Sequence, residues 1–216
     1  PVDKGRRSSG AGGTERKSQS EKPSVLLRMT ALTLICSSGD LSIRSAMEED
    51  TRMLARWRSD PKVIQFYSGR DRPLDEEGVR RHYFGRETDP GASRVEEYQP
   101  CILEVAGRPV GFLQFYRILR EDALRFGFAP EERTFGIDLF LGETDLWGQG
   151  LGARSIDLLC EFLKRERHAD RVMADPRVDN PRSVRAFEKA RFRKARRLEG
   201  HEVFEGVPRD CWLMVR

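Results

Sequence analysis

The sequence lacks any long hydrophobic run. None of its 216 residues belongs to an apolar segment near the roughly 20 residues that a membrane-spanning helix needs. The short cluster at residues 25–27 is also too small for the apolar core of a secretory signal peptide. We therefore expect no membrane partner and a cytoplasmic protein.

Cysteine and histidine are scarce and scattered. The four cysteines, Cys36, Cys101, Cys160 and Cys211, show no paired spacing, which is typical of reduced thiols in a cytoplasmic protein. The three histidines are not spaced as metal ligands are. The sequence therefore predicts neither a disulfide framework nor a metal site.

Neither sign of charge dominates. The 39 basic residues are nearly matched by 35 acidic ones, which leaves a net charge of +4. A basic protein can bind nucleic acid, but arginines spread over the whole chain are more typical of a solvated surface. With 38% apolar and 34% charged residues, the chain has the composition of a globular protein, and nucleic acid is not the favoured partner.

The chain divides into a leader and one folded domain. Residues 1–28 are rich in Gly, Ser, Lys and Arg and contain almost nothing apolar before residue 25, so we expect a disordered basic leader. The folded domain is expected over residues 40–216. Its predicted strands are 41–44, 100–106, 110–118, 135–141, 171–174, 192–198, 201–204 and 210–215, its predicted helices are 48–60, 74–83, 151–166 and 180–190, and residues 121–133 are expected to be irregular.

This order of elements indicates an α+β fold with a largely antiparallel sheet. Its most informative stretch is a strand at 135–141, a glycine loop at 147–152 and a helix that begins at once. A helix that starts in a glycine loop presents unpaired backbone N–H groups and the positive end of its dipole. Such a loop suits a phosphate group, so we expect an anion cradle here.

A second motif follows the loop and carries a resemblance. It consists of Asp175-Pro176 after a short strand, then Asn180, Phe187 and Phe192 along a helix. Together with the glycine loop it resembles the GNAT (GCN5-related N-acetyltransferase) superfamily over roughly residues 40–216. The resemblance implies a mixed, mostly antiparallel central sheet flanked by helices, with splayed central strands that hold acetyl-CoA. No metal is implied.

Further stretches, including residues 66–71, 136–143 and 210–214, resemble aminoglycoside 6′-N-acetyltransferases, among them the acetyltransferase half of bifunctional acetyltransferase–phosphotransferase enzymes. This implies acetyl transfer from acetyl-CoA to the 6′-amino group of an aminoglycoside, a resistance function, by direct transfer in a ternary complex. The residues implied in acetyl-CoA binding are Leu139, Phe140, Leu141, Trp147, Gly148, Gln149, Gly150, Leu151, Gly152, Ala153, Arg154 and Asn180.

Three positions depart from the family pattern. Trp147 stands where Gln or Arg is common, Arg191 where Gly is usual, and Phe187 where a Tyr often protonates the departing thiolate. Backbone binding of the cofactor survives these changes, but a tyrosine acid at position 187 does not. Arg154 could equally be a solvent-exposed side chain, and Asn180 also suits a simple helix N-cap.

Asp138 is the candidate catalytic base, because it interrupts an apolar strand beside the predicted cradle. A carboxylate there can attract a cationic amine and accept its proton, whereas the alternative is a solvent-facing residue on an alternating strand. A polycationic substrate needs an acidic site. The candidate substrate contacts are Trp57, Tyr67, Asp71, Asp138, Asp175 and Glu205, although Trp57 also fits a core position and Asp175 a turn.

Two other functions stay open. One is acetylation of another amine, such as a protein N-terminus or a siderophore precursor. The other is a non-catalytic module that senses CoA or binds nucleic acid, which the loss of tyrosine at Phe187 and the arginine content suggest. The sequence leaves open which aminoglycosides are accepted and whether the protein is a monomer or a homodimer.

Overall fold

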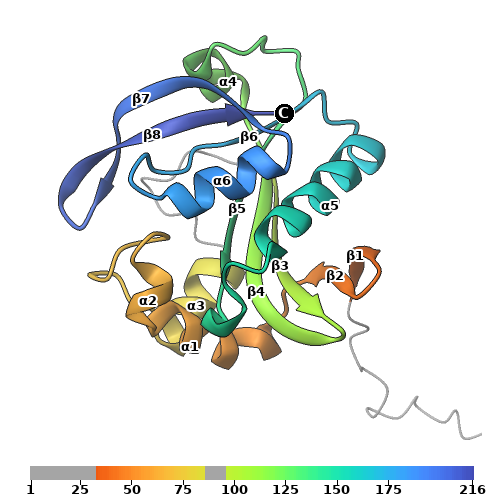
Figure 1. The fold of residues 1–216 in the computed structure, drawn as a ribbon, viewed down its shortest axis with the longest axis vertical. Helices are drawn as coiled ribbons and strands as arrows, with labels where there is room; N and C mark the ends of the chain where they lie inside the picture. Colours follow the sequence, from red (N-terminus) through yellow and green to blue (C-terminus); the bar gives the residue numbers. More distant parts are fainter. Residues whose placement is uncertain (1–32, 86–95) are drawn as a thin grey trace, which may run out of the picture. The chain divides into compact units, whose positions relative to one another are not determined.

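The central element is one eight-stranded sheet. A computed structural model describes residues 33–85 and 96–216, so the predicted leader lies outside the described residues. The strands lie in the order β1-β2-β3-β4-β5-β6-β8-β7 (Figure 1). They are β1 (Leu34–Ser38), β2 (Leu41–Ser45), β3 (Glu96–Val105), β4 (Arg108–Arg117), β5 (Thr134–Leu141), β6 (Arg171–Ala174), β7 (Arg193–Phe204) and β8 (Val207–Val215).

Neighbouring strands are antiparallel except β5 and β6, which are parallel. This confirms the mixed, mostly antiparallel sheet and the α+β class. The helices are α1 (Thr51–Ser59), α2 (Pro61–Ile64), α3 (Glu76–Val79), α4 (Arg120–Phe126), α5 (Leu151–Glu166) and α6 (Pro181–Lys189), and a π-helical turn at Arg80–Phe84 continues α3.

Side chains at the helix starts explain where several helices begin. The Asp60 carboxylate accepts from the Lys62 N–H at the start of α2, over 2.8 Å. The Asn180 side chain accepts from the Ser183 N–H at the start of α6, over 3.2 Å. Proline occupies the first position of both helices, where no N–H is needed.

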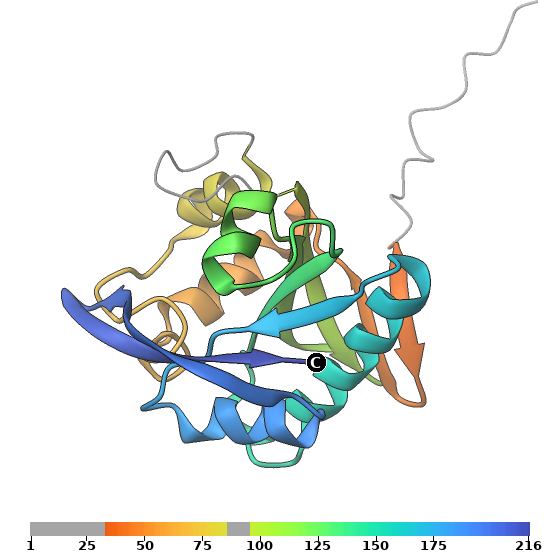
Figure 2. The same ribbon diagram turned by 90° about the horizontal axis from the view of Figure 1, so that it is seen from above.

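The sheet alternates its side chains between two apolar layers. Cys101 and Leu103 on β3 and Leu113 on β4 belong to the core under α5 and α6. Ile102 and Phe112, their neighbours in sequence, belong to the core with α1 and α3. Since successive strand residues point to opposite faces, the sheet is covered on both sides (Figure 2).

Four elements differ from the sequence prediction. One is α2, a short helix at Pro61–Ile64 that was not predicted. The stretch expected to be irregular contains α4, which Gly127 closes at φ 77° and which packs Ala123 beside Ile118 and Phe128. β1 was not predicted and lies before residue 40; it pairs with β2 across Gly39. β7 is one strand rather than two, because bulges absorb its irregular register against β8.

Candidate active site

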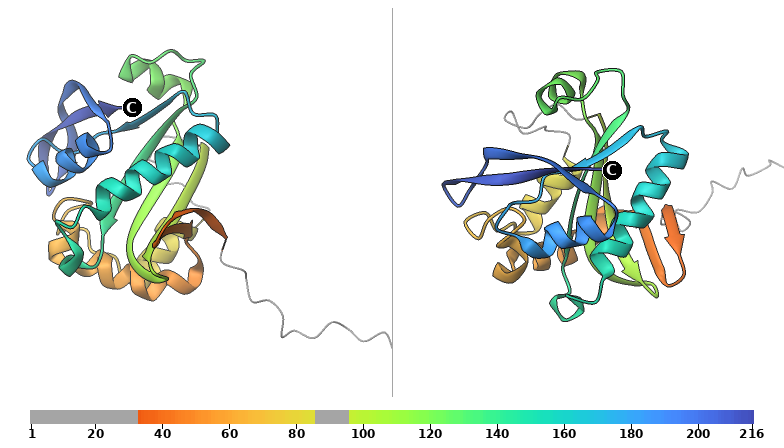
Figure 3. Two further views of the ribbon diagram at one scale, coloured as in Figure 1. Left: turned by 45° about the vertical axis from the view of Figure 1, so that its right-hand side comes forward. Right: turned by 45° about the horizontal axis from the view of Figure 1, so that its top comes forward.

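The central strands separate halfway along β5. β5 pairs with β6 only from Thr134 to Gly136, although it continues to Leu141 and stays paired with β4 throughout. β6 ends at Ala174, and the chain then follows β8, since the Trp212 N–H donates to the Pro176 carbonyl over 2.9 Å. Figure 1 and the left view of Figure 3 show β7 and β8 diverging from the distal half of β5. One edge of β5 is therefore left without a strand partner within the described residues.

The glycine loop follows β5 and leads directly into α5. Gly148 and Gly150 have φ values of 81° and 82°, a region that other residues rarely adopt. Gly150 is the N-cap of α5, and no side chain caps this end. A Cβ atom built on either glycine would meet nothing within 4 Å. The N–H groups of the first turn of α5 therefore lack a side-chain cap, and the loop before them is open around its glycines, which suits an anion.

The other predicted cofactor residues divide into backbone and side-chain roles. Leu151 and Phe140 are buried, so only their backbone atoms are available to a ligand. The Gln149 side chain donates to the Asp145 carbonyl over 3.0 Å, and the Trp147 indole N–H donates to the Leu141 carbonyl over 3.0 Å. Gly152 and Ala153 lie half-buried in the first turn of α5. The loop is thus held by its own side chains, with its amides exposed.

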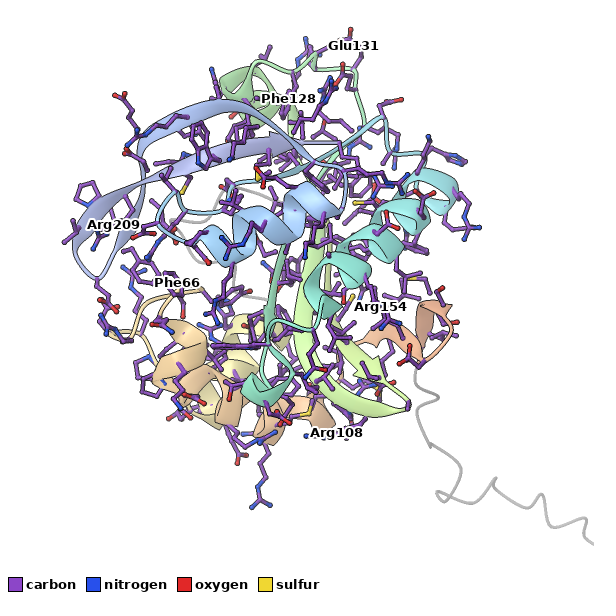
Figure 4. The ribbon with its side chains drawn as sticks, in the orientation of Figure 1. Phe66, Arg108, Phe128, Glu131, Arg154 and Arg209 are labelled. Atoms are coloured by element: carbon purple, nitrogen blue, oxygen red, sulfur yellow. The ribbon has the colours of Figure 1, made fainter. Side chains whose placement is uncertain are left out.

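Arg154 does not face the loop. It pairs with Asp40 of the β1–β2 turn, Nη2 to Oδ1 over 2.6 Å, and lies between α5 and this hairpin (Figure 4). The cation beside the loop is instead Arg182 on α6, whose guanidinium lies 4.1 Å from the Trp147 ring centre. Sequence reasoning missed Arg182, because no local pattern links the start of α6 to a tryptophan 35 positions earlier.

A cavity of about 440 Å³ lies where β5 and β6 part. Its walls come from β5, the β6–α6 connection, β7 and the loop after α2. Three carboxylates line it: Asp138, Asp175 and Glu202. Asn180 lines the same cavity, as does Tyr67, whose ring packs 4.7 Å from that of Phe140. The structure thus brings together Asp138, Asp175 and Tyr67, which were predicted as substrate contacts, and adds Glu202 and Asn180, the latter predicted as a cofactor contact.

Asp138 has an unusual environment for a carboxyl group. Burial and the nearby Asp175 carboxylate raise its pKa to about 7, although hydrogen bonds from Gln114 and Tyr116 act in the opposite direction. Gln114 lies opposite Asp138 on β4 and donates through Nε2 to Oδ2 over 2.8 Å. A carboxyl group with a pKa near 7 can accept and return a proton at neutral pH.

Asp175 and Glu202 complete the charged wall. Asp175 Oδ2 lies 3.0 Å from His201 Nε2, and this hydrogen bond raises the pKa of the histidine. Burial and the Asp175 carboxylate raise the pKa of Glu202. Sequence reasoning missed His201 and Glu202, since nothing local on β7 shows which of its residues lie near Asp175.

Three of the predicted substrate contacts, all within the described residues, do not line the cavity. Trp57 is only 1% exposed and donates to Glu143 Oε1 over 2.9 Å, so it is a core residue. Asp71 is exposed outside the cavity wall. Glu205 forms an ion pair with Arg70, and the hydrogen bond from Arg70 lowers the pKa of Glu205 to about 2. Their assignment as substrate contacts is wrong for Trp57 and unsupported for the other two.

Within the described residues, no group of three or more His, Cys, Asp or Glu side chains is arranged to hold a metal ion. No helix in the same part of the chain is long and apolar enough to cross a membrane.

The family profile of the acetyltransferase (GNAT) domain matches residues 46–199. The chain belongs to this family. The match covers the parted strands, the glycine loop, α5 and α6, which form the acetyltransferase fold described above.

Relatives with known names are similar to this GNAT chain at low identity. An aminoglycoside N(6′)-acetyltransferase type 1 from Klebsiella pneumoniae is 25% identical over 169 residues, which cover 78% of this chain and 82% of the relative. The structure of AAC(6′)-Ib with coenzyme A and kanamycin superposes with a TM-score of 0.60 at 22% identity, covering 82% of this chain and 94% of that one.

A spermidine N-acetyltransferase from Vibrio cholerae in complex with CoA and spermine gives a TM-score of 0.65 at 14% identity, covering 83% and 96%. At such identities the structural likenesses establish the fold alone.

Proposed function

We propose that the protein is an acetyl-CoA-dependent N-acetyltransferase that modifies the 6′-amino group of aminoglycosides by direct transfer in a ternary complex. One observation carries this proposal: an open glycine cradle and an unpaired edge of β5 accompany a cavity in which two further carboxylates lie with Asp138. The named relative from Klebsiella pneumoniae supports the choice of acceptor.

The residues present fit acetyl-CoA. The amides of residues 148–153 suit the pyrophosphate, because the helix dipole and the uncapped N–H groups favour an anion there. The backbone of residues 139–141 lies on the unpaired edge of β5 and suits the pantetheine amides; the Leu141 carbonyl already accepts from Trp147. The bound co-substrate supplies an activated acetyl thioester.

Asp138 handles the proton in this proposal. An alkylamine is protonated near neutral pH and has to lose a proton before it can attack. The Asp138 carboxylate lies in the cavity wall, and its pKa of about 7 suits a group that accepts this proton. Once deprotonated, the amine attacks the thioester carbonyl, and the thiolate of CoA leaves.

The departing thiolate needs a proton from a group other than residue 187. Phe187 is 3% exposed and packs against Phe192 with ring centres 5.1 Å apart, so it is part of the core and carries no hydroxyl. The nitrogen loses two protons in becoming the amide: the proton that Asp138 has taken up returns to the thiolate, directly or through water, and the second is released to solvent.

The cysteines support direct transfer over an acyl-enzyme. Burial raises the pKa values of Cys36, Cys160 and Cys211 to about 12 and also raises that of Cys101. A thiol in such surroundings is not the thiolate that a covalent mechanism needs. None of the four lines the cavity.

Two carboxylates of the cavity, Asp138 and Glu202, suit a polyamine. Neither forms an ion pair with a cationic side chain in the described part of the chain, whereas Asp175 pairs with His201. Three arginines also line the cavity: Arg58 donates to the Tyr83 hydroxyl, Arg177 donates to Asp179 and Arg72 is exposed. Asp138 and Glu202 are thus the carboxylates available to ammonium groups of an acceptor.

A matched pair of acceptors tests the proposal. Neomycin carries an amino group at position 6′, whereas paromomycin carries a hydroxyl there and is otherwise the same. We expect CoA release with neomycin, a product heavier by one acetyl group at the 6′ nitrogen, and release with paromomycin at the no-acceptor rate. Equal rates with both would reject the 6′ position.

The two remaining functions are outcomes of the same assay. Acetylation of spermidine or of a peptide N-terminus without acetylation of neomycin would indicate another amine as the acceptor. Tight acetyl-CoA binding with no transfer to any amine, together with salt-dependent DNA binding, would indicate a non-catalytic module.

A further inference from the structure

Tyr116 lies across β5 at the one position of that strand where the side chain is absent. Tyr116 on β4 is paired with Gly136 on β5. A Cβ atom on Gly136 would lie 2.5 Å from Cε2 of Tyr116, 2.7 Å from Cζ and 3.0 Å from the hydroxyl oxygen. Any other residue at 136 would therefore displace the ring.

This placement brings the tyrosine hydroxyl to Asp138. Residues two apart on a strand share a face, so Gly136 and Asp138 face the same side as their partners Tyr116 and Gln114. The Tyr116 hydroxyl and the Asp138 carboxylate line the same cavity, and the hydroxyl lowers the pKa of Asp138 as a donor to its charged form. Burial holds the pKa of Tyr116 well above its usual range, so the phenol keeps its proton.

A third residue fixes the direction of the second hydrogen bond. The Tyr98 hydroxyl donates to Gln114 Oε1 over 2.9 Å. The amide nitrogen of Gln114 is therefore the end that faces Asp138, to which it donates over 2.8 Å. Gln114 and Tyr116 on β4 thus both act on one carboxylate, and both favour its charged form.

We propose that Tyr116, laid across β5 by Gly136, is a positioning residue that holds the Asp138 carboxylate ready to accept a proton. The proposal concerns the site of the proposed function, and it rests on that function for the claim that the proton comes from the acceptor amine. A merely structural tyrosine would fill the space over Gly136, and its hydroxyl would be dispensable.

Other charged and titratable groups also act on Asp138. Asp175 and Glu202 act on Asp138 itself, and Tyr67, Tyr83 and Tyr98 lie near enough to feel its charge. The cavity around it is also lined by Arg58, Arg72, Arg177, His82 and His201. These groups are the same in the wild type and in Tyr116→Phe. The difference between the two in the pKa of Asp138 therefore measures the effect of the Tyr116 hydroxyl alone.

Direct titration of Asp138 separates this proposal from the proposed function. Carbon NMR of the carboxyl resonances in the protein without ligand gives the midpoint, and Asp138→Asn identifies the signal. We expect a midpoint near pH 7 for the wild type and an upward shift of roughly half a pH unit or more in Tyr116→Phe, because a donor to the charged form is lost. Gly136→Ala should shift it in the same direction.

Gly111→Ala is the matched control. Its Cβ atom would lie 2.6 Å from the Phe140 carbonyl oxygen, so it strains the same pair of strands without touching the hydroxyl. We expect it to lower the melting temperature and leave the midpoint unchanged. An unchanged midpoint in Tyr116→Phe would overturn the proposal.

The acid limb of kcat/KM gives a second readout. In an active enzyme it should move to higher pH by the same amount in Tyr116→Phe. Failure of all acetyl transfer, with the NMR shift intact, would reject the proposed function and leave the role of Tyr116 standing.

Discussion

Arg70 and Glu205 join two walls of the cavity across 135 positions of sequence. Arg70 donates to Glu205 through its backbone N–H over 2.9 Å, through Nε over 2.7 Å and through Nη2 over 2.8 Å. Arg70 follows Tyr67 and Ser68 in the loop after α2, and Glu205 follows Glu202 and Val203 in β7. The pair therefore links a loop and a hairpin that both line the cavity.

Loss of this ion pair should weaken acceptor binding. In Glu205→Gln we expect the acceptor KM to rise several-fold with little change in the Kd of acetyl-CoA, because the two walls are no longer held together. Glu76→Gln is the control, since it breaks an exposed ion pair with Arg80 on α3. Steady-state kinetics at low and high salt measure the effect; an acceptor KM equal to that of Glu76→Gln would contradict it.

Asp138→Asn should stabilise the fold in a pH-dependent way. The folded pKa of about 7 is above the unfolded value of about 3.9. The folded state therefore holds a proton between pH 4 and 7 that the unfolded state has lost, so the contribution of Asp138 to stability falls as pH rises through this window. Asparagine does not titrate.

Thermal or urea unfolding should thus show the stability advantage of Asp138→Asn growing from pH 4 to pH 8. On the order of 1 to 3 kcal/mol is expected above pH 7. A difference in the free energy of unfolding between Asp138→Asn and the wild type that stays constant from pH 4 to pH 8 would contradict this prediction.

Gly150→Ala should impair acetyl-CoA binding. At φ 82° an alanine is strained by roughly 1 to 2 kcal/mol, and its methyl group enters the open space over the loop. Gly107→Ala in the β3–β4 turn is a matched control, because its φ is 75° and its surroundings are equally open. Calorimetry should show weaker binding only in Gly150→Ala; equal affinities in both variants would argue against the cradle.

Trp57 and Glu202 should show opposite effects. Trp57→Phe loses the hydrogen bond to Glu143 and part of the packing under Gly142, so we expect a loss of roughly 1 to 3 kcal/mol in stability with an unchanged acceptor KM. A raised acceptor KM in Trp57→Phe with normal stability would restore Trp57 as a substrate contact.

Glu202→Gln should have the opposite effect: it should raise the acceptor KM and leave stability nearly unchanged.

The local parts of the site could be predicted from the sequence. The glycine loop, the start of α5 and the N-cap at Asn180 depend on residues within a few positions of one another, and the structure places them as expected. Asp138 stood out because it interrupts an apolar strand. Backbone conformation and capping are local properties, so a single sequence contains their signal.

The partners of Asp138 could not be predicted in the same way. Gln114 and Tyr116 reach it only through the register of β4 against β5, and Glu202 only through the bulged pairing of β7 with β8. Register depends on the packing of the whole sheet. Trp57 shows the same limit, since helical spacing did not reveal that Gly142 leaves room for its ring.

The most direct test compares initial rates of CoA release in the wild type and Asp138→Asn, with neomycin as acceptor, alongside the Kd of acetyl-CoA. We predict that kcat/KM falls by roughly 100- to 10,000-fold in the variant, the range expected for loss of a general base. The Kd should stay within about twofold, because the cradle is built from the backbone amides of the loop and the first turn of α5. A variant that retains the wild-type rate would contradict the assignment of Asp138 as the proton acceptor.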